Sequence, residues 1–172
     1  MVAAPGVVAA SPYLDVEGMV RGDHGEIMAV RVRGVDPTRV GQVTDLPDDL
    51  VVGSIESLDA AESDPDEPSI LIGNQPAASL GVAVGEPLVL ISPFGGPRTP
   101  LGPAPRLKRF HVTGIFESSF FQYDELFTYV NLAAAQDFRR VGDVVEGIEA
   151  RTTDFYRSRS VATGVQEVLG FP

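Results

Sequence analysis

Two histidines and one acidic run are the side chains in this 172-residue sequence that suggest acid–base or metal chemistry. His111 alternates with apolar residues in a strand-like segment, and His24 falls in the turn-like stretch 22–25. A hydrolytic triad on either would need a serine in a nucleophile elbow, and no such motif is present. Both histidines are therefore interpreted as structural or surface residues. A small hydrolase using His111 or His24 is kept as the alternative from another functional class.

The other candidate sites lack the spacing that their ligands require. Asp64, Asp66 and Glu67 are not accompanied by the glycine and terminal glutamate of an EF-hand calcium loop. Gly95 and Gly96 lack the lysine and the following helix of a phosphate-binding loop. The sequence has no cysteine, which excludes thiolate metal sites and cysteine nucleophiles. We predict a chain that is not an enzyme and that needs no metal or other cofactor.

A stiff cationic segment is the more informative feature. Residues 91–116 hold five of the 14 prolines, and strand-like runs at 87–92 and 109–116 flank them. Proline fixes φ and has no backbone N–H, so these five prolines are predicted not to continue a sheet ladder. The segment also carries four of the 13 basic residues with no acidic residue between them: Arg98, Arg106, Lys108 and Arg109. A long, stiff, solvent-facing loop of this kind is typical of an element that docks another protein.

Short strands and helices alternate around this loop without the regular spacing of βαβ units, which favours an α+β fold. Period-two alternation and turn residues predict strands at 27–33, 69–73, 87–92, 109–116, 126–130 and 145–151. Capping residues predict helices at 74–81, 131–140 and 154–169, with Asn74, Asn131 and Asp154 as N-caps. Residues 45–49 and 120–124 are expected to be connectors.

Composition limits the possible partners. The chain is 44% hydrophobic, enough for a buried core, and its formal net charge is −11. An acidic chain is poorly suited to general binding of nucleic acid or anionic membranes, so no nucleic-acid partner is predicted. No apolar run approaches the roughly 18–20 residues that a membrane-spanning helix needs.

Several segments, taken in order, resemble one known family. They include Pro5-Gly-Val-Val-Ala-Ala-Ser-Pro12, Ile72-Gly-Asn-Gln-Pro-Ala-Ala-Ser-Leu-Gly81, Thr99-Pro-Leu-Gly-Pro-Ala-Pro105 and Val112-Thr-Gly-Ile-Phe116. Together they resemble the large extracytoplasmic domain of the LolC/LolE-type permeases of the lipoprotein-releasing ABC transporter. These permeases belong to the wider MacB-like periplasmic core domain superfamily. The Thr-Pro-Leu-Gly-Pro-x-Pro segment is the part most specific to the LolC-like branch.

The resemblance implies a two-lobed periplasmic core domain. A mixed α/β Porter-like lobe would comprise residues 1–52 and 119–172, and an inserted β-rich Sabre-like lobe would comprise 53–118 and carry a protruding proline-rich hairpin loop. The family has transmembrane helices around this domain. The chain is therefore expected to be a single excised periplasmic fragment, from the periplasmic side of a bacterial inner membrane.

The resemblance also implies the site residues. In LolC-like proteins the proline loop is a hook that recruits the periplasmic lipoprotein carrier LolA. Carried over by position, the hook comprises Pro93, Phe94, Pro97, Arg98, Thr99, Pro100, Leu101, Gly102, Pro103, Ala104 and Pro105. A supporting pad would begin at Arg106, Lys108 and Arg109, of which only the cationic character is carried over.

The implied partners are those of a permease that releases lipoproteins from the inner membrane. They are a LolA-like carrier, a partner permease of LolC/LolE type, acylated lipoprotein cargo and a separate cytoplasmic subunit that hydrolyses ATP. An alternative within the superfamily is a MacB-like exporter or an FtsX-like regulatory domain. The proline hook favours the LolC-like interpretation over both.

Overall fold

One large mixed sheet organises the chain in the computed structural model, which describes residues 6–22, 25–59, 64–93, 96, 98–100, 102–119, 121–154, 156 and 158–169. Its strands run in the order β10-β1-β2-β9-β4-β8-β3, and β5 pairs with both β1 and β8. The strand bounds are β1 Val7–Arg21, β2 Ile27–Val35, β3 Leu50–Val52, β4 Ser69–Gly73, β5 Pro87–Ser92, β8 Arg106–Phe116, β9 Phe127–Asn131 and β10 Gly147–Thr152. β2–β9 and β4–β8 are parallel and the other pairs antiparallel. The predicted α+β class is confirmed by this arrangement.

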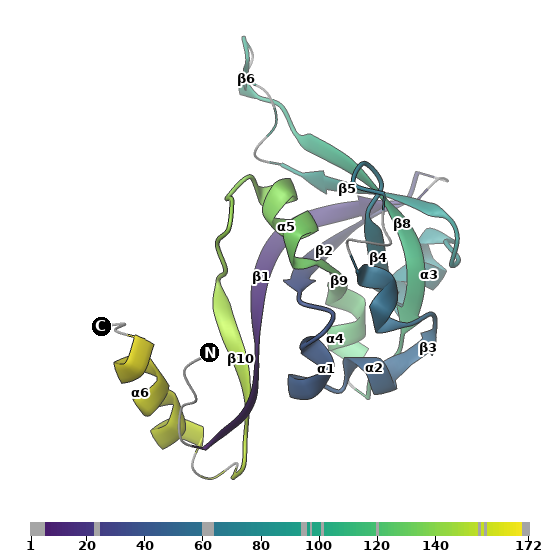
Figure 1. The fold of residues 1–172 in the computed structure, drawn as a ribbon. Coiled ribbons are helices and arrows are strands. Elements are labelled where there is room, and N and C mark those ends of the chain that lie inside the picture. Colours follow the sequence, from purple (N-terminus) through teal and green to yellow (C-terminus); the bar gives the residue numbers. More distant parts are fainter. Residues whose placement is uncertain are drawn as a thin grey trace.

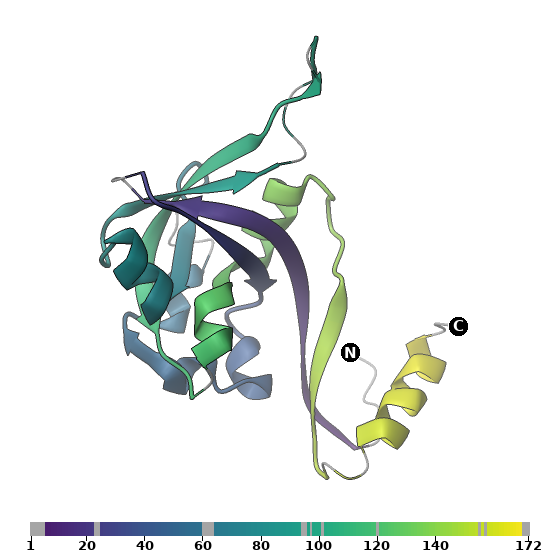
Figure 2. The ribbon, with the colours of Figure 1, turned by 180° about the vertical axis from the view of Figure 1, so that it is seen from behind.

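Helices are short and lie around the sheet. Their bounds are α1 Val40–Val43, α2 Leu46–Asp49, α3 Asn74–Leu80, α4 Phe121–Leu126, α5 Leu132–Arg139 and α6 Ser158–Leu169, with a 3₁₀ turn at Ile55–Leu58. β1 and β10 extend together as a two-stranded ribbon away from the body, and α6 lies at the far end of this ribbon (Figures 1 and 2). The start of β1 lies there too, on the side of the molecule opposite β6 (Arg98–Thr99).

Two clusters of buried side chains form the core. The larger one joins α5 to the sheet and includes Leu14, Ile70, Phe110 and Phe138. Phe110 of β8 and Phe138 of α5 meet edge to face, with ring centroids 6.5 Å apart. Because aromatic pairs of this geometry stabilise beyond the area they bury, this contact fixes α5 against β8. The smaller cluster lies around Tyr129 and packs the helices α1 and α2 and the 3₁₀ turn.

Strands from both predicted lobes share the sheet. β4, within 53–118, pairs with β9, and β5 pairs with the end of β1. The lobe boundaries after residues 52 and 118 stay a prediction. The hydrogen bonding shows that the two segments are joined by backbone ladders and not only by side-chain contacts.

Three local predictions were wrong. Residues 45–49 contain α2, in which Pro47 takes a first-turn position that tolerates the missing N–H. Residues 120–124 run into α4, where the buried Asp124 carboxylate accepts the Ser118 backbone N–H at 3.0 and 2.9 Å. Asn74 is the first residue of α3 and not its cap, because Gly73 holds the extended N-cap conformation.

A largely buried arginine joins three strands of the sheet. Arg33 on β2 donates from Nε and Nη2 to the two Asp15 carboxylate oxygens at 2.7 and 2.8 Å, and from Nη1 to Glu149 of β10 at 2.6 Å. Its guanidinium also lies over the rings of Tyr13 and Phe127, at 4.6 and 5.0 Å from their centroids. Arg33 therefore links the β1–β10 ribbon to the centre of the sheet.

Candidate protein-docking site

The hook, defined as residues 93–105, is a hairpin that projects from the sheet. β5 and β8 pair antiparallel up to Ser92 and Arg106, and beyond them β6 (Arg98–Thr99) and β7 (Gly102–Pro103) form a separate two-stranded sheet. Pro100 is part of the turn between them. Figures 1 and 2 both show this hairpin reaching well beyond the rest of the molecule. Phe94, Pro97 and Leu101 of the predicted hook lie outside the described residues.

Proline and glycine shape the base of the hook. Pro93 directly follows Ser92 and Pro105 directly precedes Arg106, the last pair of the β5–β8 ladder, and neither proline has an N–H with which to extend it. A Cβ at Gly96 would lie 2.2 Å from the Ala104 carbonyl oxygen and 2.7 Å from that of Pro105. The two arms of the hairpin therefore approach each other as only glycine allows, which restricts their relative movement.

One proline prediction was wrong. Pro103 lies within β7 and pairs with Arg98. Proline is tolerated where a strand is at an edge, and the two-residue β7 has only β6 as its neighbour.

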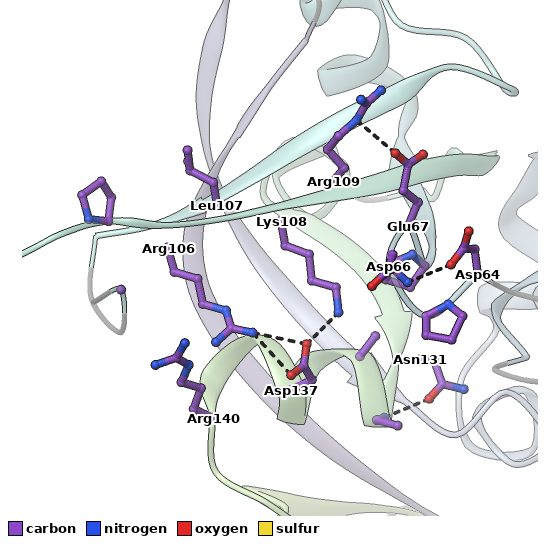
Figure 3. A pocket seen from close by; sticks show the side chains of 16 residues that line it. Asp64, Asp66, Glu67, Arg106, Leu107, Lys108, Arg109, Asn131, Asp137 and Arg140 are labelled. Atoms are coloured by element: carbon purple, nitrogen blue, oxygen red, sulfur yellow. Dashed lines mark hydrogen bonds and ion pairs between the residues drawn. The ribbon is translucent and has the colours of Figure 1, made fainter. Parts of the chain in front are cut away.

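Two predicted pad residues lie against α5. Lys108 Nζ donates to Asp137 Oδ2 at 2.6 Å, and Arg106 Nη2 donates to both Asp137 oxygens at 3.3 Å (Figure 3). The hydrogen bond from Lys108, helped by the charge of Arg106, holds the pKa of Asp137 below its usual value. The Arg106 guanidinium also lies 5.9 Å from the Phe138 ring centroid. The side chains of Arg106 and Lys108 are only 16% and 15% exposed, so they anchor the hook base to α5.

The third pad residue points elsewhere. Arg109 pairs with Glu67 at 3.3 Å, and both side chains are substantially exposed. Arg106, Lys108 and Arg109 thus all have acidic partners. Asp137 and Glu67 come from distant parts of the sequence, so the fold partly compensates the positive charge of the pad.

A groove of about 870 Å³ lies between the hook base, α5 and the loop at 64–68 (Figure 3). Its lining includes four basic residues, Arg106, Lys108, Arg109 and Arg140, and four acidic residues, Asp64, Asp66, Glu67 and Asp137. The acidic loop and Arg140 were not among the predicted site residues. The sequence places them far from the hook, and only the fold brings them together.

The residues considered for catalysis are not gathered at this groove. His111 is exposed on β8, and its backbone N–H donates to the Pro68 carbonyl at 2.9 Å. His24 lies outside the described residues. Within the described ranges, no group of three or more His, Cys, Asp or Glu side chains is placed to hold a metal ion.

Curated relatives are similar to nearly the whole chain. No family model matches it. The lipoprotein-releasing system transmembrane protein LolC of Xylella fastidiosa (strain Temecula1 / ATCC 700964) is 34% identical over 169 residues, which cover 98% of this chain and 38% of the relative. LolC of Neisseria meningitidis serogroup B is 30% identical over 149 residues, covering 87% of this chain and 34% of the relative.

About a third of the LolC sequence is thus similar to nearly all of this chain.

This LolC-like chain spans 38% of the length of the first relative and 34% of the Neisseria one. Among the residues that the structure describes, no helix is long and apolar enough to cross a membrane. Its fold is shared with solved domains of ABC-type transporters. The extracellular domain of YknZ superposes with a TM-score of 0.62 at 12% identity, over 98% of this chain and 79% of that one. The periplasmic region of MacB from Actinobacillus actinomycetemcomitans gives 0.61 at 13% identity, over 96% and 67%. The LolC-like chain thus has the fold of the periplasmic domains of MacB-like transporters.

Proposed function

We propose that this LolC-like domain docks a soluble lipoprotein carrier of the LolA type through its hook. The observation that carries the proposal is the projecting β6–β7 hairpin, which extends beyond the sheet while its base is held in place. A preformed element loses little conformational freedom on binding, and that lowers the cost of docking. The resemblance to the LolC-like hook supplies the identity of the partner.

The anchoring of the hook base supports this role. Arg106 and Lys108 connect β8 to Asp137 of α5, and Phe138 of the same helix packs in the core. A force applied to the hook is therefore transmitted to α5 and the sheet rather than dissipated in a loose loop. We propose that the parent permease uses this connection to pass acylated lipoproteins from the inner membrane to the carrier. ATP hydrolysis would take place on a separate cytoplasmic subunit and a second LolC/LolE-type permease would complete the complex.

Titration with a purified LolA-type carrier tests the proposal. We expect saturable binding to the isolated domain and a carrier-dependent rise in its melting temperature, because a ligand that binds only the folded state stabilises it by about 2.7 kcal/mol at 100 times its Kd. ATP with magnesium should produce no shift, since we propose that the domain is not catalytic. A carrier that neither binds nor stabilises the domain, or a clear shift with ATP, would contradict the proposed function.

A further inference from the structure

Arg140 has an unusual backbone conformation beside the groove. It ends α5 with φ 59° and ψ 45°, and it is the one non-glycine residue with positive φ among the described residues. Its N–H donates to the Asp137 carbonyl at 3.0 Å, which caps the helix. Glycine is the usual residue at a left-handed helix end, and a residue with a Cβ costs free energy there. A residue with a side chain is therefore held where glycine would be less strained.

Charge compensation at the helix end does not require Arg140. Arg139 already occupies the last turn, donating to Glu146 at 3.5 Å and to the Asp15 carbonyl at 3.3 Å. A cation there compensates the helix dipole without any backbone strain. We therefore interpret Arg140 through its position in the lining of the groove.

The Arg140 side chain is exposed and has no carboxylate partner in the part of the chain that the structure describes. Arg140 and Arg106 both line the groove (Figure 3), and the Nη2 of Arg106 is held by Asp137. Arg106 and Lys108 thus occupy the Asp137 carboxylate on this wall of the groove. Among the described residues of the groove, Arg140 is thus the basic residue for which no carboxylate is in place, while Asp137 is already engaged by Arg106 and Lys108.

We propose that Arg140 is a partner-recognition residue that binds a carboxylate side chain of a protein segment lying in the groove at the base of the hook. The planar guanidinium presents two parallel N–H donors to a carboxylate, and such charge-assisted pairs are stronger than neutral hydrogen bonds. The identity of the partner as the carrier rests on the proposed function. The proposal that Arg140 binds a carboxylate is independent of that function.

Substitutions at Arg140 should move stability and binding in opposite directions. Arg140→Gly relieves the left-handed backbone and is expected to raise the melting temperature by about 2–4 °C. The same change should weaken carrier binding on the order of tenfold, because the charge-assisted pair is lost. Arg140→Glu should weaken it further. Arg159→Glu on α6, which changes the net charge equally but lies far from the groove (Figure 1), should leave carrier affinity unchanged. Unchanged affinity in Arg140→Gly would overturn the proposal.

A probe other than the carrier separates this site from the proposed function. An acetylated triglutamate peptide, titrated at low ionic strength into the isotope-labelled domain, should shift the side-chain Nε–Hε resonance of Arg140. The shift should persist when the hook is deleted and disappear in Arg140→Gln. Peptide binding without carrier binding would support the carboxylate site and refute carrier docking. Absence of an Arg140 shift would refute the carboxylate site whatever the carrier does.

Discussion

Replacing the hook by a two-residue Asn-Gly turn is expected to abolish binding of a LolA-type carrier and to leave the melting temperature within about 2 °C of the parent. Ser92 and Arg106 are directly paired at the end of the β5–β8 ladder, so a tight hairpin turn joins them without altering the sheet. None of the described hook residues belongs to either buried cluster. Loss of the hook should therefore remove contact surface for a partner but little stability.

A second variant controls for the loss of chain length. Changing Pro97, Pro100 and Pro103 to glycine keeps the length and charge of the hook but makes it flexible. Because a flexible loop must be ordered on binding, this variant should bind the carrier more weakly than the parent yet better than the deletion. Full carrier affinity in the deletion variant would show that the hook is not the docking element. A drop of more than about 10 °C in its melting temperature would show that the hook is part of the packed structure.

Arg33→Met should lower the free energy of unfolding more than any of the other single substitutions described above. In Arg33→Met, Asp15 and Glu149 are left facing each other without a cation, and the contacts with Tyr13 and Phe127 change. Removing one partner of a buried ion pair costs about 3–5 kcal/mol, since the remaining charges are uncompensated. Denaturant unfolding followed by circular dichroism measures this difference in the free energy of unfolding.

Arg31→Met is the matched control for that experiment. Arg31 lies on the same strand, but its pair with Glu17 is 3.7 Å long and the two side chains are 41% and 87% exposed. An exposed pair of this kind contributes about 0–1 kcal/mol. If Arg33→Met cost no more than Arg31→Met, Arg33 would not be the link between the β1–β10 ribbon and the sheet.

Local patterns predicted much of the fold. The apolar run 69–73 is β4, with the predicted bounds and every residue buried. Asn131 caps α5, since its side chain accepts the Ala133 N–H at 2.8 Å, and Gly81 ends α3 in the left-handed conformation. In each case the deciding interaction lies within a few residues. The short helices α2 and α4 were missed because they span too few residues for a helical period to be visible.

The electrostatics of the candidate site were beyond sequence reasoning. Lys108 and Arg106 are separated from Asp137 by 29 and 31 positions, and only the packing of α5 on β8 brings them together. A cluster of basic residues in the sequence thus became an anchored hook base. Among the described residues that line the groove, the cation without an acidic partner is Arg140, which closes a predicted helix and showed no other signal in the sequence.

Photo-crosslinking from the hook tests carrier docking most directly. A benzoylphenylalanine placed at Pro100, which is exposed in the turn of the hook, should crosslink to the LolA-type carrier on irradiation. The same group at Tyr156, whose side chain is 94% exposed near α6, should give no crosslink. A crosslink from position 100 that disappears with excess unlabelled carrier is the predicted result. Equal crosslinking from both positions, or crosslinking from position 156 alone, would contradict docking through the hook.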